Sequence, residues 1–97
     1  MEQQLHCLIY GRVQHVGFRR FVVRYAVSLG VSGFVRNRFD GSVEVYAVAL
    51  PEVLSKFLGC CNKGPIFASV TDVQFLPADD SLFRLIDKNE FKVLPSE

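Results

Sequence analysis

The first segment of the chain has the residue pattern of a β-strand, in which successive side chains point to opposite faces. Residues 3–11 place every second side chain on one face, and that face is apolar: Leu5, Cys7 and Ile9. The opposite face is also largely apolar, as expected of a strand in the centre of a sheet. The alternation breaks over residues 11–17, where two glycines indicate a loop.

A helical period follows this loop. Apolar residues recur at spacings of three and four, namely Phe18, Phe21, Val22, Tyr25, Ala26 and Leu29. Arg20 and Arg24 lie on the opposite side of such a helix, which is expected to face solvent. Gly30 then provides a C-terminal stop signal. The pattern predicts an amphipathic helix over residues 18–29.

A hairpin is predicted next. Residues 31–37 and 42–49 have strand character, and Asp40-Gly41 between them is a strong turn signal. Pro51 then suits the first turn of a second helix. The apolar face of that helix consists of Leu54, Phe57, Leu58 and Cys61.

The last third of the chain is patterned less clearly. Residues 69–76 and the short segment 91–93 are predicted as strands, and residues 77–90 as a loop with partial strand character. The order β-α-β-β-α-β with an extra short strand indicates an α+β protein. The expected fold is a ferredoxin-like α/β sandwich, with a mostly antiparallel sheet and two helices on one face. Many unrelated functions use this fold, so function has to be argued from a site.

The composition narrows the class of protein. The 97 residues are 49% hydrophobic, which predicts one domain spanning residues 1–97 with a packed core. No apolar run approaches the roughly 18 to 20 residues that cross a bilayer, and the N-terminus lacks a signal-peptide pattern. We therefore expect a cytoplasmic protein without a membrane partner. The three cysteines are expected to be reduced thiols, and no metal or cofactor motif is present.

Charge is distributed unevenly along the chain. The net charge is only +1, yet residues 3–39 contain six arginines and no Asp or Glu. Arginine binds phosphate or carboxylate through a planar fork of donors. On charge alone this block indicates either anion recognition or a solvated basic surface.

The start of the first helix is the main candidate site. The first N–H groups of a helix lack internal partners and carry the positive end of its dipole. Residues 14–20 contain no Ser, Thr, Asp or Asn to cap the helix, and they place Arg19 and Arg20 where positive charge is unfavourable. A bound anion would satisfy such a site. Arg20 is expected to point to solvent. Asn37 has a donor and an acceptor and could position a water, although an Asn near a turn often bonds locally.

Two segments resemble the signatures of the acylphosphatases. Gly11-Arg-Val-Gln-His-Val-Gly-Phe-Arg19 is similar to the family's first motif, Gly-x-Val-Gln-Gly-Val-x-Phe-Arg. Gly33-Phe-Val-Arg-Asn37, followed by Asp40-Gly41, is similar to the second. The resemblance covers nearly the whole chain, and this family folds as a ferredoxin-like sandwich.

The resemblance implies hydrolysis of acyl phosphates to a carboxylate and inorganic phosphate, without metal or cofactor. Arg19 matches the family's phosphate-binding arginine and Asn37 its water-orienting asparagine. The phosphate would also be held by main-chain N–H groups, those of Gln14, His15, Val16, Gly17 and Phe18. A carboxylate leaving group has a conjugate-acid pKa of roughly 4 and needs no general acid, so ordinary phosphate esters are expected to be poor substrates.

The sequence departs from the family pattern at His15, where the family has glycine, and at Ala49. A positive φ at residue 15 would suit glycine better than His. The His15 side chain could donate to the phosphate or point to solvent, and we favour solvent. A phosphate-binding domain with weakened catalysis is therefore an alternative function.

Other classes of function are less well supported. An RNA-binding module of the same element order would use Phe34, Phe39 and Tyr46 for stacking, but the Lys/Arg-Gly-aromatic pattern is absent and the net charge is low. A cysteine-dependent phosphatase needs Cys and Arg six positions apart, and no such pair exists. A stand-alone relative of the acylphosphatase-like domain of a carbamoyl-phosphate-processing factor is disfavoured by the short chain. We expect a small-molecule acyl phosphate as partner, no nucleic acid, and a monomer, because no exposed apolar stripe is left over in the predicted elements.

Overall fold

The computed structural model describes residues 1–97. Its elements are, in chain order, β1 (Gln3–Arg12), α1 (Phe18–Leu29), β2 (Ser32–Asn37), β3 (Val43–Ala49), α2 (Pro51–Lys63), β4 (Ser69–Leu76), α3 (Asp80–Phe83) and β5 (Phe91–Val93). None of the helices has the length and apolar character needed to cross a membrane.

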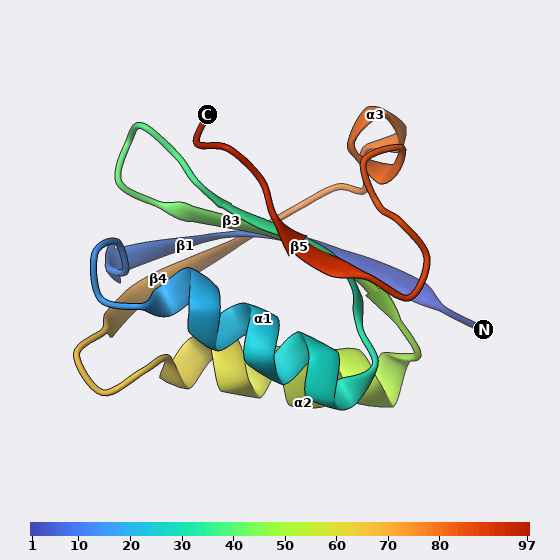
Figure 1. The fold of residues 1–97 in the computed structure, drawn as a ribbon, viewed down its shortest axis with the longest axis horizontal. Helices are drawn as coiled ribbons and strands as arrows, with labels where there is room; N and C mark the ends of the chain where they lie inside the picture. The colour runs from blue at the N-terminus through green and yellow to red at the C-terminus, as the bar shows by residue number, and fades with distance from the viewer.

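The strands form one sheet in the order β4-β1-β3-β2-β5. All neighbours are antiparallel except β2 and β5, which are parallel. Helices α1 and α2 lie side by side on one face of the sheet, and the short α3 lies on the other side (Figure 1). This arrangement confirms the predicted ferredoxin-like α+β sandwich, including the short terminal strand.

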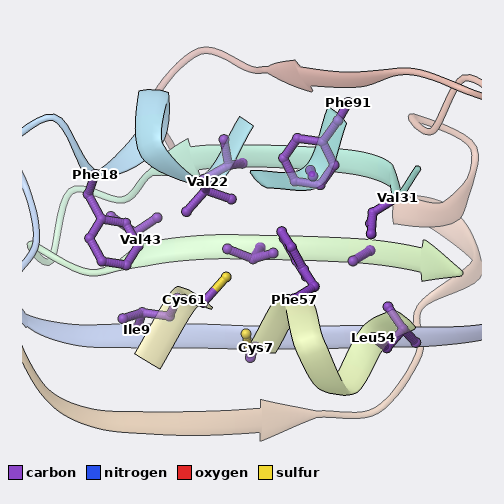
Figure 2. Close-up of a cluster of buried hydrophobic side chains, with 14 of the residues drawn as sticks. Cys7, Ile9, Phe18, Val22, Val31, Val43, Leu54, Phe57, Cys61 and Phe91 are labelled. Atoms are coloured by element: carbon purple, nitrogen blue, oxygen red, sulfur yellow. The ribbon is translucent and has the colours of Figure 1, made fainter. Parts of the chain in front are cut away.

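The core lies between the sheet and the two long helices. It consists of 16 buried residues from all the strands except β4, from α1 and α2, and from the segments between them. Figure 2 shows this cluster, in which Val22 of α1 and Phe57 of α2 lie over the sheet. Along β3 the valines at 43 and 45 enter this core, because side chains of a strand alternate between its two faces. The core therefore fixes which residues of each strand face away from the helices.

Two local predictions are wrong. Residues 80–83 form the helical turn α3, which begins because the Asp79 carboxylate accepts a hydrogen bond from the Ser81 N–H at 2.9 Å. An Asp before this segment is typical of a helix N-cap, and it favours a helical turn over the predicted loop with strand character. Tyr25 was predicted on the core face of α1 but is 37% exposed. The buried stripe of α1 is narrower than its apolar pattern and consists of Phe18, Val22 and Ala26.

A bulge at the end of β1 directs the chain toward α1. The pairing of β1 with β4 shifts register between Tyr10 and Gly11. Gly11 has φ of 124°, and a Cβ built there would lie 2.0 Å from the Ser69 carbonyl oxygen. Only glycine fits this close approach, so the position at which β1 leaves the sheet is fixed by residue 11.

The last residues extend the sheet along β2. Leu94 N–H donates to the Val35 carbonyl at 3.0 Å, and Glu97 N–H donates to the Asn37 carbonyl at 2.9 Å. The Glu97 carbonyl in turn accepts from Phe39 N–H at 2.9 Å. These bonds hold the end of β2, and therefore the backbone of Asn37, between β3 and the C-terminal segment.

Apolar side chains remain on the surface. Ile66 is 90% exposed, Phe67 72% and Phe75 59%. Ile66 and Phe67 lie in the segment before β4, outside the predicted elements. Phe75 lies on β4 and departs from the expectation that these elements leave no exposed apolar stripe, because β4 is an edge strand of the sheet. The monomeric state stays a prediction.

Candidate active site

The loop between β1 and α1 presents a series of main-chain donors. Gly17, the N-cap of α1, is left-handed with φ of 78° and makes no side-chain cap bond. His15 is also left-handed, with φ of 62°. None of the N–H groups of residues 14–20 donates to an acceptor within the chain. Unpaired amides at a bend before a helix, with the helix dipole behind them, form a site suited to an anion.

The side chain of Gln14 ties this loop to the β2–β3 hairpin. Its Nε2 donates to the Arg38 carbonyl at 2.8 Å and to the Ser42 carbonyl at 2.9 Å. Both acceptors belong to the turn that follows Asn37. The sequence predicts a role only for the N–H group of Gln14, because no local pattern indicates side-chain bonds over this distance.

The first turn of α1 carries positive charge that nothing in the chain neutralises. Arg19 is half-buried, Arg20 is exposed, and neither makes an ion pair or a hydrogen bond. Helix α1 has no acidic residue in its first turn, whereas α2 has Glu52 there and Lys63 in its last turn. The charges of α2 follow its dipole and those of α1 oppose it, at a few tenths of a kcal/mol or more per charge.

Asn37 lies at the end of β2 with only 8% of its surface exposed. Its side-chain oxygen Oδ1 is buried and has no hydrogen-bond partner. A buried acceptor without a donor costs about 1–3 kcal/mol, and no contact within the chain offsets this cost at Asn37. The local turn bond that could have explained Asn37 is made instead by Asp40, whose carboxylate accepts from the Ser42 N–H and hydroxyl.

An open cleft of about 560 Å³ joins these features. Its walls come from the loop, the start of α1, the end of β2 and β5. The polar and glycine residues that line it are His15, Gly17, Arg19, Arg20 and Asn37. The apolar residues are Val13, Phe18, Val23 and Val93.

Five of the seven predicted site residues therefore line the same cleft: His15, Gly17, Phe18, Arg19 and Asn37. The other two do not. Gln14 turns its side chain to the hairpin, and Val16 packs against the hydrophobic core. Their predicted contribution came from their main-chain N–H groups, and these are unpaired.

The cleft has cationic and neutral polar groups but no carboxylate. Cysteine chemistry is also disfavoured, because Cys7 and Cys61 are buried in the core. Burial, with a smaller contribution from the charge of Glu44, raises the pKa of the Cys7 thiol to about 12. Burial likewise raises the pKa of Cys61. The arrangement can hold an anion and position a water beside it.

A buried ionic network lies on the sheet face opposite α1 and α2. Glu44 accepts from His6 Nε2 at 2.7 Å and from Arg36 Nε at 2.6 Å, and Arg36 also contacts Glu97 at 2.7 Å. Burial alone raises the pKa of the Glu44 carboxyl, but the hydrogen bonds from His6 and Arg36 outweigh burial and lower it.

This network changes the interpretation of the arginine-rich half. Arg36 pairs with Glu44 and Glu97 and therefore stabilises the fold. Arg38 lies 4.0 Å from the carboxylates of Asp40 and Glu44. The arginines that remain unpaired in the cleft are Arg19 and Arg20. The sequence signal for the network was Glu44, an acid that alternates with core valines on β3.

Two of the three aromatic residues proposed for stacking in the RNA-binding alternative are buried. Phe34 and Tyr46 are fully buried, and Tyr46 is linked to the segment before α3 because its hydroxyl accepts from Asp79 N–H at 3.1 Å. Aromatic side chains that stack on bases must be accessible. Of the three candidate stacking residues, Phe39 alone is exposed.

The fold and the cleft together define a class: small α+β proteins in which the strand-to-helix loop suits an anion and a nearby amide suits a water. Comparison with known proteins identifies the particular family. Residues 5–92 match the sequence model of acylphosphatase. The chain belongs to the acylphosphatase family and is a hydrolase of that family.

Individual relatives agree with this assignment. The chain is 41% identical over 90 residues to an acylphosphatase of Nitrobacter winogradskyi, which covers 92% of this chain and 91% of that protein. The crystal structure of acylphosphatase from Bacillus subtilis is similar over 97% of this chain and 99% of its own, with 31% identity and a TM-score of 0.82. HypF of T. kodakarensis contains a similar region, with 26% identity and a TM-score of 0.77, over all of this chain but 12% of HypF.

Proposed function

We propose that the cleft hydrolyses acyl phosphates, with the phosphoryl group in the loop before α1 and the attacking water on Asn37. The observation that carries this proposal is the buried Oδ1 of Asn37, which has no partner and belongs to the same cleft as the unpaired amides and Arg19. The N–H groups and Arg19 suit the negatively charged phosphoryl group, and the acceptor Oδ1 of Asn37 suits a water molecule next to it.

The phosphoryl oxygens would accept from the main-chain N–H groups of residues 14–18 and from the guanidinium of Arg19. Phosphoryl transfer passes through a loose transition state whose charge is spread over the three equatorial oxygens. Donors already fixed by the fold stabilise that charge without having to reorganise. The hydrogen bonds of Gln14 to the hairpin would hold this loop at a fixed position relative to the end of β2, where Asn37 lies.

The water would donate one hydrogen bond to Asn37 Oδ1, leaving an oxygen lone pair free to attack phosphorus. A new P–O bond forms as the bond to the acyl oxygen breaks, and the electron pair of that bond leaves with the carboxylate. One proton of the water passes to a phosphoryl oxygen of the substrate. Because the carboxylate is a weak base, it departs without a general acid, and the cleft contains no carboxylic acid to act as one.

The alternative of a phosphate-binding domain with weakened catalysis rests on His15. Its left-handed backbone is unfavourable for a residue other than glycine by about 1–2 kcal/mol. This cost would affect catalysis only if it displaced the neighbouring N–H groups. Under that alternative, inorganic phosphate protects the fold against unfolding but acyl phosphates are turned over only slowly.

The test is hydrolysis of benzoyl phosphate in excess EDTA by the wild type and by Arg19→Gln and Asn37→Ala. We expect turnover that survives the chelator and falls by about 10²–10³-fold in each variant. Arg24→Gln is the matched control, since Arg24 is an exposed arginine of the same helix outside the cleft, and it should retain activity. Circular dichroism checks that each variant is folded.

The proposal would be overturned by absence of turnover in the wild type, or by full activity in folded Arg19→Gln and Asn37→Ala. A simple ester such as p-nitrophenyl phosphate provides a further arm, because its leaving group is a stronger base and should be released far more slowly. A small-molecule acyl phosphate as substrate, a monomeric state and a cytoplasmic location complete the proposal.

A further inference from the structure

The cleft extends beyond the proposed phosphate position along α1. Val23 follows Arg19 by four residues and Arg20 by three, so these side chains are neighbours on one side of the helix, about 5–6 Å apart at Cβ. Val23 is half-buried, and Val93 of β5 lines the same cleft with 48% of its surface exposed. This apolar part of the cleft suits the carbon skeleton of an acyl group.

Arg20 adds a charge that the proposed hydrolysis does not use. Its side chain lines the cleft, makes no ion pair or hydrogen bond, and lies in a helix turn where positive charge is unfavourable. No Asp or Glu lines the cleft to neutralise it. The Glu97 carboxylate, at the C-terminal segment beside β2, is already bound to Arg36 at 2.7 Å.

The five main-chain N–H groups of residues 14–18 and the Arg19 guanidinium already provide about two donors for each of the three phosphoryl oxygens, so Arg20 is not needed to bind them. The main-chain N–H groups and Arg19 serve the phosphoryl oxygens, and Arg20 is left near the apolar wall. A single guanidinium matches a single carboxylate, which it can bind through two parallel hydrogen bonds.

We propose that Arg20 provides a second anion position in the cleft, and that the enzyme prefers acyl phosphates whose acyl group carries its own carboxylate. The substrate class is then the monoacyl phosphates of dicarboxylic acids, with the carbon skeleton against Val23 and Val93. This inference rests on the proposed function, because it assigns the acyl end of the substrate whose phosphoryl end binds at Arg19.

The test compares 3-carboxybenzoyl phosphate with benzoyl phosphate. The rigid ring prevents the added carboxylate from attacking its own acyl group. The measured quantity is the ratio of kcat/KM for the two substrates in the wild type, Arg20→Gln and Arg24→Gln. We expect the wild type to favour the carboxylated substrate, and Arg20→Gln to lower the ratio about two- to fivefold, the effect of one exposed ion pair.

The Arg24→Gln variant removes the same charge from the same helix outside the cleft, so its ratio should match the wild type. An unchanged ratio in Arg20→Gln overturns the second anion position, and so does an equal fall in Arg24→Gln, which would show an effect of overall charge. If the wild type hydrolyses neither substrate, the proposed function itself is overturned. High salt should lower the wild-type ratio toward that of Arg20→Gln, because salt screens an exposed pair.

Discussion

Replacing Glu44 by glutamine tests the buried network that supports β2 and β3. The Glu44 side chain is 3% exposed, and its two oxygens accept from His6 at 2.7 Å and from Arg36 at 2.6 Å. Glutamine has nearly the same shape but no charge and only one acceptor oxygen. Arg36, whose side chain is 8% exposed, would then have only one anionic partner, Glu97, whose side chain is 65% exposed.

The expected loss can be estimated from this geometry. Removing one partner of a buried ion pair costs about 3–5 kcal/mol, because the remaining charge is left without compensation. A chain of this length has a total stability of about 5–15 kcal/mol. One kcal/mol shifts Tm by about 4–8 °C in a domain of this size, so Glu44→Gln should lower Tm by roughly 12 °C at the least.

The loss should depend on pH in a defined direction. The pKa of Glu44 is lowered in the folded protein from its ordinary 4.5 by the hydrogen bonds that outweigh its burial. A carboxyl group whose pKa is lowered by folding stabilises the folded protein at pH values above its pKa in the unfolded chain. This stabilisation disappears as the pH falls through its pKa in the folded protein. The gap between wild type and Glu44→Gln should therefore be full at pH 7 and should shrink below about pH 4.

The assay is urea unfolding followed by circular dichroism at pH 7 and at pH 3.5. Arg36→Met in the Glu44→Gln background provides the control, because removing the second charge should restore part of the stability. Two results would refute the reasoning: a Glu44→Gln variant within 1 kcal/mol of the wild type at pH 7, a threshold well below the about 3–5 kcal/mol expected, or a gap that is independent of pH.

Two further predictions concern the loop before α1. Gln14→Ala removes both hydrogen bonds to the hairpin and should cost about 1–3 kcal/mol in urea unfolding and lower kcat for benzoyl phosphate, whereas Gln74→Ala, at an exposed glutamine of β4, should change neither. Equal behaviour of the two variants would contradict the positioning role. His15→Gly relieves a left-handed backbone and should raise stability by up to about 1 kcal/mol. Its pH–rate profile between pH 5 and 8 should match the wild type, and a changed profile would show that the imidazole contacts the substrate.

Local patterns were sufficient for most of the fold. Helix α1 begins at Phe18 and ends at Leu29 as predicted, because its apolar spacing and Gly30 depend only on neighbouring residues. Strand boundaries differ from the prediction by no more than one residue, as at Val43, where β3 begins one residue later than expected. The segment 77–90 was harder to predict because its turn, α3, is set by a cap and by contact with Tyr46 rather than by periodicity.

The site was only partly visible in the sequence. Its main-chain part follows from a loop that enters a helix without a cap, which is a local property. The bond from Gln14 to Arg38 spans 24 residues, and the pair His6–Glu44 spans 38. Such contacts depend on which strands are neighbours, so a single sequence gives no pattern for them. Arg20 is exposed as predicted, but its place in the lining of the cleft could not be predicted from the helical pattern alone.

The unpaired amides of residues 14–20 have a consequence for how this protein can change over time. A peptide N–H belongs to every residue except proline, so the identity of a side chain in this loop is separable from the donor it supplies. Between residues 15 and 18, substitutions that keep the left-handed turns at residues 15 and 17 would leave every main-chain donor in place. A single proline would delete a donor outright. We therefore expect backbone shape, more than side-chain chemistry, to limit which residues positions 15–18 accept, and His15 with its left-handed backbone is consistent with this.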